Sequence, residues 1–533
     1  MPTSLTFHGA ASTVTGSCYV IDHDGGRLMI DCGLFQGTKT IRELNYRPFP
    51  FKPAGIDALV LTHAHIDHTG LVPKLTANGY KGPIFATEPT IDLMAFMLPD
   101  SGHIQESEVE RVNQRNRKRG RPLVEPIYTR RDAEAVLELA RAENYDEWFE
   151  PMKGIRARYW NAGHILGSAS IELEVADRNE KRPIRILFSG DIGPDEKTFQ
   201  DDPSGPNDVD YLICESTYGD RDREDLSLEA RRARLRDAVN KGLGRGGNLL
   251  IPAFAVERTQ ELIYSLVKLM EDGEIPDAPI FIDSPLAIKV TETFARHRNS
   301  LHDIDPDMRI FRSPRIRFTQ SVEESKAINT IRKGAIIMAA SGMCDAGRIR
   351  HHLKNNLWRR EASVLFVGYQ APGSLGHLIL SGEKRVRIHG EEIEVNCDIQ
   401  RIDSYSAHAD QGELVQWVKE RLPVRNTIFL SHGEPDAMKA FREHLAVAGC
   451  NPRHILTPEL DDRFELSLGG EPARHTEHRR LSHEQAAADH DWHSAYARLL
   501  LDLGKRLDTI ENSDVKLALL ERMREALTRD QRA

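Results

Sequence analysis

The sequence predicts an α/β protein built in layers, and three observations support this prediction. The chain has 533 residues, with 40% hydrophobic and 29% charged side chains, a balance typical of a globular protein with a sizeable core. Short apolar runs end repeatedly at an acidic residue, a histidine or a glycine, as strands do at the rim of a sheet. Helical patterns lie between these runs, for example over residues 129–143 and 257–270. Strands and helices interspersed in this way are typical of α/β folds.

The expected strands fall into two groups along the chain. In the first group each apolar run ends at an acidic residue, a serine or a threonine next to a chemically active side chain; the runs are 17–22, 27–31, 58–62, 185–189, 211–215 and 427–431. The second group lies between about residues 220 and 375 and alternates more regularly with helices; its runs are 248–252, 279–283, 335–339 and 363–367. This βαβ rhythm predicts a parallel sheet in the middle of the chain.

Composition and charge exclude several classes of protein. With 71 Lys and Arg against 81 Asp and Glu, the net charge is −10, so bulk charge does not attract nucleic acid, although a local basic groove remains open. No apolar run approaches the about 18 residues of a membrane span. Six cysteines without a CxxC pair indicate neither a disulfide framework nor a zinc finger. We therefore expect a soluble, cytoplasmic protein that has no membrane partner.

The strongest chemical signal is a histidine cluster directly after the expected strand 58–62. Its sequence is THAHIDHTG over residues 62–70, with three imidazoles and one carboxylate within six residues. Neutral imidazole and carboxylate are ligands that zinc prefers, and a tight loop can direct them to one point. The spacing lets His63 and His65 face one metal ion while Asp67 and His68 face a second. A polar loop with incidental histidines is the ordinary alternative, and it does not account for this density of ligands.

Four further residues can complete such a metal site. Each follows an expected strand or lies in a loop: Asp31 in IDCG, His164 in AGHILGSAS, Asp191 in SGDIG and His408 in SYSAHADQ. Any one of them alone is explained by a turn-capping carboxylate or a loop histidine bonded to the backbone. Their occurrence in this order after the histidine cluster favours a metal site.

These motifs together resemble the metallo-β-lactamase superfamily and, within it, the β-CASP family of RNA-processing nucleases. Glu215 in CESTYGDR, His377 in GSLGH and His408 in YSAHAD resemble motifs A, B and C of the β-CASP branch. Three longer stretches resemble its bacterial and archaeal members: IPAFAVERTQE, DSPLAIKVTE and SGMCDAGRIRHHLKNNL. The resemblance covers residues 5–466. Relatives of these members are the eukaryotic pre-mRNA 3′-end-processing endonuclease and, more distantly, ribonuclease J.

The resemblance implies an αββα metallo-β-lactamase sandwich with an inserted β-CASP α/β domain that contains a parallel sheet. The sandwich is expected over residues 1–218, the β-CASP domain over 219–375, and the returning part of the sandwich over 376–469. Residues 470–533 lie outside the resemblance and repeat leucine at helical spacing, so we expect a helical C-terminal extension there. Such a leucine stripe is compatible with a homodimer.

The resemblance also implies a site for two zinc ions, which manganese could replace. The expected ligands are His63, His65, His164 and Asp191 for one ion, and Asp67, His68, Asp191 and His408 for the other. Asp31 and His432 are expected beside the metals, where such groups hold the ligands in place.

The implied reaction is hydrolysis of RNA phosphodiester bonds by a hydroxide that bridges the metals, leaving a 5′-phosphate and a 3′-hydroxyl. The expected catalytic residues are Asp67, Glu215 and His377. A hydrogen bond from His377 to Glu215 would raise the pKa of the imidazole, so that His377 could protonate the departing 3′-oxygen. DNA-directed members of the family tend to carry Val at motif C, so His408 favours RNA over DNA.

The substrate is expected to be single-stranded RNA, bound in a cleft between the two domains. The candidate RNA contacts are Arg258, Lys289, Arg348, Ser374, Arg315 and Arg317. A second basic run, over residues 111–121, could also bind phosphates, although most charge runs are solvated surface.

Two other functions remain open at this point. A small-molecule ester or thioester hydrolase on the same metal centre would tolerate loss of Glu215 and His377, and it would need no large inserted domain. A binding scaffold of a processing complex would retain RNA without turnover. The choice between endonuclease and exonuclease also stays open.

Overall fold

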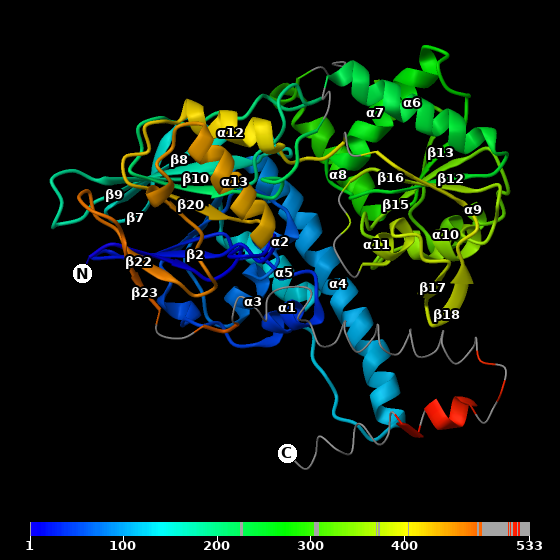
Figure 1. Cartoon of the computed structure of the whole chain (residues 1–533), viewed down its shortest axis with the longest axis horizontal. Helices are drawn as coiled ribbons and strands as arrows, with labels where there is room; N and C mark the ends of the chain where they lie inside the picture. The colour runs from blue at the N-terminus through cyan, green and yellow to red at the C-terminus, as the bar shows by residue number, and fades with distance from the viewer. Residues whose placement is uncertain are drawn as a thin grey trace.

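The computed structural model describes residues 2–223, 227–302, 309–368, 370, 374–402, 405–476, 479–481, 510, 512, 515–519 and 521–522. Two domains account for most of these residues (Figure 1). One is a two-sheet sandwich formed by both the N-terminal and the later parts of the chain, and the other is an α/β domain inserted between them. We call them the sandwich domain and the insert domain.

Two sheets form the sandwich domain. The first has the order β23 (Ala473–His475), β22 (Arg463–Glu465), β1 (Ser4–Phe7), β2 (Tyr19–His23), β3 (Gly26–Ile30), β4 (Ala58–Val60), β5 (Ile84–Ala86), β6 (Ala140–Ala142). The second has the order β21 (Ile455–Leu456), β20 (Thr427–Ser431), β11 (Tyr211–Glu215), β10 (Ile184–Phe188), β9 (Ala169–Val175), β8 (Ile155–Asn161), β7 (Trp148–Met152). Buried apolar side chains from both sheets form one core between them, with Phe7, Phe188 and Phe429 at its centre.

Helices cover the outer faces of both sheets, which gives the αββα layering. Beside the first sheet lie α1 (Lys39–Glu43), α2 (Ile66–Thr69), α3 (Val72–Ala77), α4 (Glu88–Lys118) and α5 (Arg130–Ala135). Beside the second lie α12 (Gln411–Glu420) and α13 (Pro435–Val447). Local sequence sets where several of these helices begin, because Thr129 with Asp132, and Asp410 with Glu413, form capping boxes.

The insert domain contains one sheet in which every pair of neighbouring strands is parallel. Its order is β14 (Ile316–Phe318), β13 (Ile280–Ile282), β15 (Ile336–Ala339), β12 (Leu249–Pro252), β16 (Ser363–Phe366), β19 (Asp398–Arg401). Its helices are α6 (Leu228–Gly244), α7 (Arg258–Glu271), α8 (Pro285–Arg296), α9 (Val322–Ile328), α10 (Ile349–Asn356) and α11 (Leu375–Leu380). A hairpin of β17 (Arg385–Ile388) and β18 (Glu391–Glu394) follows α11.

Short 3-10 helices occupy several connections: η1 (Leu44–Tyr46), η2 (Pro53–Gly55), η3 (Val136–Leu139), η4 (Arg298–Ser300), η5 (Arg309–Arg312) and η6 (Pro452–His454). The pattern over residues 129–143 is therefore only partly α-helical. It becomes α5, then η3, then the edge strand β6, which pairs with β5. The tertiary requirement for a strand at this edge overrides the local helical pattern.

The domain boundaries differ from those expected at two points. The insert domain continues past residue 375, because β19 pairs with β16 and the hairpin β17–β18 precedes it. The sandwich domain continues past residue 469, because β23 pairs with β22. In the extension, residues 515–519 and 521–522 are helical, while Leu499, Leu503, Leu507, Leu520 and Leu527 lie outside the described residues. Among the described residues no helix is both long and apolar enough to cross a bilayer.

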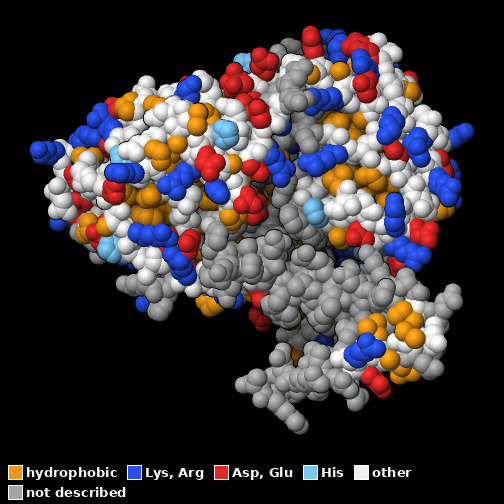
Figure 2. Space-filling model, in the orientation of Figure 1, with side chains coloured by type: hydrophobic (Ala, Val, Ile, Leu, Met, Phe, Trp, Pro, Cys, Tyr) orange, Lys and Arg blue, Asp and Glu red, His pale blue; other side chains and the backbone are white. Residues whose placement is uncertain are grey.

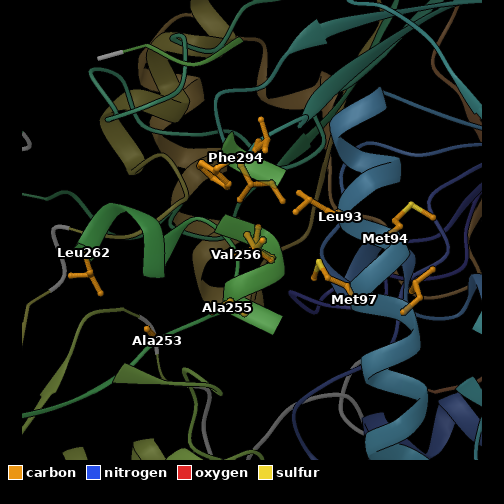
Figure 3. Close-up of a cluster of buried hydrophobic side chains, with 14 of the residues drawn as sticks. Leu93, Met94, Met97, Ala253, Ala255, Val256, Leu262 and Phe294 are labelled. Atoms are coloured by element: carbon orange, nitrogen blue, oxygen red, sulfur yellow. The ribbon is translucent and has the colours of Figure 1, made fainter. Parts of the chain in front are cut away.

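The two domains share a buried apolar contact along α4. Leu93 and Met97 of this helix point toward Val256 and Phe294 of the insert domain (Figure 3). At the edge of the contact, Arg296 and His297 pair with Asp92. A continuous core across the domain boundary holds the insert domain at a defined place over the sandwich.

Candidate metal centre

The candidate ligands lie where strands of the two sheets end. Asp31 directly follows β3, and the loop that begins at His63 follows β4 and enters α2. In the second sheet Asp191 follows β10, Glu215 is the last residue of β11, and His432 directly follows β20. Strand ends that meet at one edge of a sandwich thus assemble side chains from distant parts of the chain.

The first group of donors consists of His63, His65, His164 and Asp191. Nδ1 of His65 lies 3.1 Å from Nε2 of His63 and 3.1 Å from Nε2 of His164. Oδ2 of Asp191 lies 3.5 Å from Nε2 of His63 and 3.6 Å from Nε2 of His164. Four buried or half-buried donor atoms therefore surround one point.

The second group consists of Asp67, His68 and His432, together with the other oxygen of Asp191. Nε2 of His68 lies 3.2 Å from Nε2 of His432 and 3.2 Å from Oδ1 of Asp191. Nε2 of His432 lies 3.6 Å from both Oδ2 of Asp67 and Oδ1 of Asp191. The carboxylate of Asp191 thus stands between the groups with one oxygen toward each.

These donors fit a pair of zinc ions. Tetrahedral zinc binds imidazole nitrogen at about 2.0–2.1 Å, which places neighbouring donors about 3.3–3.4 Å apart. The spacings of 3.1–3.6 Å within both groups agree with that geometry. In addition, Oδ1 of Asp191 is buried, and although Nε2 of His68 lies 3.2 Å away, no described residue donates to it with hydrogen-bond geometry. A buried carboxylate oxygen without a hydrogen-bond donor is expected where a cation supplies the partner.

The second ring nitrogens of the ligands are held by neighbouring groups. Nδ1 of His68 lies 2.7 Å from Oδ2 of Asp31, whose carboxylate also accepts hydrogen bonds from the backbone N–H and hydroxyl of Thr62. Nδ1 of His164 lies 2.8 Å from the carbonyl oxygen of Ala407. Nδ1 of His432 lies 3.0 Å from the hydroxyl of Thr217. Such partners orient the rings and leave the other nitrogen directed at the metal.

Burial and charge set the protonation of the donors. Burial, with the nearby imidazoles, lowers the pKa of His63 and His164 well below the usual value, and burial lowers the pKa of His65 to about 4. These rings are neutral at pH 7, as a metal ligand must be. Although burial opposes it, the positive field of the imidazoles of His432 and His68 holds the pKa of Asp191 well below its usual range.

The opposite shift occurs in the second group. Burial would lower the pKa of His68, but the carboxylates of Asp191 and Asp31 raise it well above the usual value. The pKa of His432 is also raised, because Asp191 and Asp67 outweigh its burial. Binding of a cation at this group therefore displaces protons.

Close backbone packing brings the ligand loop into place. A Cβ atom at Gly33 would lie 1.6 Å from the carbonyl oxygen of Asp67, so only glycine allows this approach. Asp31 and His432 adopt φ values of +56° and +49°, a region that non-glycine residues rarely occupy. Strained backbone at two residues of one cluster is typical of functional sites.

His408 lies beside the donor groups and pairs with Glu215. Its Nδ1 is 3.2 Å from Oε1 of Glu215, and its Nε2 is 3.9 Å from Oδ2 of Asp191. Glu215 also accepts hydrogen bonds from the backbone N–H groups of Ile192 and Thr217. His432, expected beside the metals, thus lies with Asp67 and His68, while His408, expected as a ligand, forms a third group of possible donors with Glu215 and Asp191.

His377 does not take the place that the sequence predicts for it. The described hydrogen bonds of the Glu215 carboxylate join it to Ile192, Thr217 and His408, so the expected pair between His377 and Glu215 is absent from the described residues. His377 lies in the first turns of α11, where its backbone N–H donates to Ser374. Ser374 therefore caps a helix.

A cleft of about 290 Å³ opens over the donors. From the sandwich domain it is lined by His65, Asp67, His164, Asp191, His408 and His432, among others. From the insert domain the lining includes Phe254, Val256, Arg258, Gly342, Met343 and Gly368. The insert domain thus forms the second wall of the cleft that contains the metal centre.

Of the six candidate RNA contacts, Arg258 alone is among the described residues that line this cleft. Its side chain is largely buried, and its Nη1 donates a hydrogen bond to the carbonyl oxygen of Val367. Three of the others pair with acidic or aromatic side chains: Arg348 with Asp283, Arg315 with Asp277, and Lys289 with the ring of Phe96.

Arg317, the sixth candidate, lies over the ring of Phe281. On the face seen in Figure 2, Lys and Arg side chains are spread over both domains and mixed with Asp and Glu. This face therefore carries no continuous basic band among the described residues.

A two-sheet sandwich with paired His and Asp donors at one edge, facing a cleft under an α/β domain, defines a metallo-hydrolase. Comparisons with known proteins agree with this class. Three family models match successive parts of the chain: the metallo-β-lactamase superfamily over residues 12–92, the Beta-Casp domain over 259–379, and a Zn-dependent metallo-hydrolase RNA specificity domain over 392–458.

Curated proteins match over most of the chain. Ribonuclease TTHA0252 of Thermus thermophilus is 35% identical over 450 residues, which cover 83% of this chain and 95% of that protein. Transcription termination factor FttA of Methanosarcina mazei is 30% identical over 450 residues, which cover 81% of this chain and 67% of that protein. An RNase J-like protein of Methanocaldococcus jannaschii is 28% identical over 432 residues, which cover 81% of this chain and 92% of that protein. The chain belongs to the β-CASP family of RNA-processing nucleases within the metallo-β-lactamase superfamily, and it is a metal-dependent RNA hydrolase.

Proposed function

We propose that this protein is a two-zinc ribonuclease that hydrolyses single-stranded RNA to products with a 5′-phosphate and a 3′-hydroxyl. The observation that carries the proposal is the carboxylate of Asp191, which stands between two donor groups with one oxygen toward each. Two-metal sites of this kind catalyse in-line displacement at phosphorus.

The proposed ligands follow the geometry of the two groups. His63, His65 and His164 would hold one zinc ion, Asp67, His68 and His432 would hold the other, and Asp191 would bridge them. Bound there, two divalent cations supply a nucleophilic water at neutral pH and neutralise charge on the phosphate. Asp31 would fix the ring of His68 through the 2.7 Å contact to its Nδ1.

The chain itself supplies the proton for the leaving group. We assign this role to His408, because its Nδ1 is held by Glu215 and its Nε2 end faces Asp191 and the cleft. With Nδ1 held by Glu215, the ring of His408 is oriented so that Nε2 can donate a proton to the departing 3′-oxygen. His377, which the sequence predicts for this role, is not part of the proposal.

Zinc-dependent cleavage of RNA tests this function directly. The 533-residue chain, loaded with zinc, is expected to cleave end-labelled single-stranded RNA, to lose the activity in a chelator, and to regain it with zinc or manganese. The His68→Ala variant is expected to be inactive. End analysis should find 5′-phosphate and 3′-hydroxyl termini.

Three outcomes would contradict the proposal: equal cleavage by His68→Ala, RNA binding without turnover, or hydrolysis of small esters with RNA left intact. Circular and linear RNA compared in the same assay would separate endonuclease from exonuclease cleavage, because only an endonuclease opens a circle.

A further inference from the structure

We propose that Phe254 forms a subsite that stacks on one unpaired base of the RNA next to the metal centre. The inference rests on the proposed ribonuclease function and deepens it, because it names the part of the substrate that the insert domain recognises. Unpaired bases stack on aromatic side chains in many single-stranded RNA complexes.

Phe254 has an unusual environment for a large apolar side chain. It lies in the loop between β12 and α7, and 41% of its surface is exposed. This exposed surface lines the same cleft as Asp67, His408 and His432. The hydroxyl of Thr259 donates a 2.7 Å hydrogen bond to the carbonyl oxygen of Phe254, so the start of α7 holds the loop. The ring is therefore available to a ligand that enters the cleft of the candidate metal centre.

On one side, the ring of Phe254 packs against the backbone of Gly342 in the insert domain. A Cβ atom at Gly342 would lie 2.7 Å from both Cδ2 and Cε2 of Phe254, so the ring rests directly on the glycine. Side chains larger than hydrogen would displace the ring from this position. The amide of Gln370 donates a 2.9 Å hydrogen bond to the carbonyl oxygen of Gly342, which holds the supporting loop in turn. The ring therefore has a fixed position and an open side toward the cleft.

The chemistry of this wall favours a base over a phosphate. Among the described residues that line the cleft, Arg258 is the single Lys or Arg, and its Nη1 already donates to a backbone carbonyl. The other insert-domain residues of the lining are mostly apolar or glycine, with Gln370 as a polar side chain: Pro252, Ala253, Val256, Gly342, Met343, Val367, Gly368 and Gln370. Apolar and glycine surface beside an exposed ring accommodates a flat aromatic ligand, whereas phosphate recognition needs cationic or N–H donors. We assign the phosphates to the metal side of the cleft and one base to the insert side.

A cycle that combines a protein variant with an altered RNA tests the subsite. A set of RNAs carries a single abasic nucleotide at successive positions around the cleavage site, and kcat/KM is measured for each RNA with the zinc-loaded protein and with Phe254→Leu. For the unmodified RNA, Phe254→Leu is expected to lower kcat/KM about tenfold, mainly through KM. At one position the abasic nucleotide should lower kcat/KM of the wild type by a similar factor. The same RNA should lower kcat/KM of Phe254→Leu only slightly.

Three further variants control the interpretation. Phe254→Trp keeps an aromatic face and should retain cleavage within about threefold. Gly342→Ala should displace the ring and reproduce the loss seen in Phe254→Leu. Trp358→Ala removes another exposed aromatic, 51% exposed and outside the described lining of the cleft, and should leave kcat/KM unchanged. Zinc content is measured for all variants, because a stacking residue should not alter it.

Two results would overturn the subsite. One is unchanged kcat/KM in Phe254→Leu, and the other is an equal loss for every abasic RNA, which would show that the ring acts on the fold rather than on one base. Both presuppose that the wild type cleaves RNA. If the wild type fails to cleave any RNA, the proposed function fails first, so the two failures can be told apart.

Discussion

Asp191 is the residue on which both donor groups depend. Its two oxygens lie 3.5 Å from Nε2 of His63 and 3.2 Å from Nε2 of His68, so one carboxylate belongs to both groups. Each group also has imidazoles of its own. Removal of an imidazole from one group should therefore weaken that group and leave the donors of the other in place.

Replacement of His432 tests the composition of the second group. We expect His432→Ala to lower the zinc content from two ions per chain to about one and to abolish RNA cleavage, because the group loses one of its two imidazoles. Zinc content is measured by elemental analysis of purified protein. The exposed His475, changed to Ala, serves as the control and should keep both ions. Loss of one ion in His408→Ala, with both retained in His432→Ala, would support the ligand set expected from sequence.

Replacement of His408 tests the proton donor. We expect His408→Ala to lower kcat for RNA cleavage by about 10²–10⁴-fold with zinc content unchanged, because general-acid catalysis contributes a factor of this size. The pH–rate profile of the variant should lose the limb that reports the acid. His377→Ala should cleave RNA close to the wild-type rate, since Glu215 pairs with His408. A large loss of kcat in His377→Ala would instead support His377 as the general acid, as expected from the sequence.

At the scale of elements, one buried carboxylate at the end of β13 connects several segments of the insert domain. Asp283 accepts hydrogen bonds from Thr319 after β14, Ser325 on α9, and Arg348 and His352 at α10, at distances of 2.6–2.7 Å. Its side chain is fully buried. One residue thus fixes a strand end against the segments that follow it, and it keeps Arg348 from being free to bind RNA.

Substitution of Asp283 should therefore destabilise the protein. We expect Asp283→Asn to lower the free energy of unfolding by about 3–5 kcal/mol, because the half-buried Arg348 loses its charge partner and the buried His352 loses its carboxylate. Urea unfolding followed by circular dichroism measures the change. Asp277→Asn is the matched control, since its 72% exposed side chain pairs with Arg315, and it should cost less than about 1 kcal/mol.

The same carboxylate predicts an acid dependence. Burial alone would raise the pKa of Asp283, but its hydrogen bonds with His352, Ser325, Thr319 and Arg348 hold it well below the usual value. A depressed carboxyl pKa gives stability that is present above about pH 4 and is lost as the pH falls further. The difference in free energy of unfolding between the wild type and Asp283→Asn should thus become smaller in acid. A difference that stays constant from pH 7 to pH 3 would contradict this.

For the whole molecule, the decisive feature is the contact between the insert domain and the sandwich-domain loop that carries the candidate ligand His164. Lys197 lies 3.4 Å from Oε1 of Glu257, and the two side chains are 1% and 2% exposed. Lys197 also donates to the carbonyl oxygen of His164, and Glu257, at the start of α7, accepts from the backbone N–H of Leu166. The β-CASP insert therefore braces the loop that carries His164, in addition to forming a wall of the cleft.

Removal of one partner of this pair should cost stability. We expect Lys197→Met to lower the free energy of unfolding by about 3–5 kcal/mol, since Glu257 would be buried without its countercharge. In the double variant Lys197→Met/Glu257→Leu the loss should be smaller, because no unpaired charge remains. Lys268→Met, in an exposed pair with Asp272, is the control and should change stability by less than about 1 kcal/mol. Additive losses in the double variant would contradict a coupled pair.

The strands and most of the site could be predicted from the sequence, and particular residues show why. The expected strands 211–215 and 427–431 coincide with β11 and β20, because apolar runs of only about five residues are too short for most helices and are typical of buried strands. His63, His65, His164 and Asp191 were recognisable because donors of the right chemistry follow such strands. Phe254 was missed as a site residue, although it lies in the signature stretch IPAFAVERTQE, because a lone phenylalanine in an apolar stretch predicts only packing.

From the sequence by itself, local apolar patterning determined the α/β class, and ligand chemistry determined the residue types that gather at the strand ends. The αββα layers and the class of protein were implied by the resemblance of its motifs to the β-CASP nucleases. The tertiary structure alone decided which late histidine joins which group, that β19 and β23 extend their sheets, and that Arg348 is engaged by Asp283. The physical reason is that local patterning specifies which face of a strand is buried, whereas the direction of a loop side chain depends on contacts between segments hundreds of residues apart. His408 and His432 both follow motif-like sequences, and only the packing of their loops directs one ring to Glu215 and the other to Asp67.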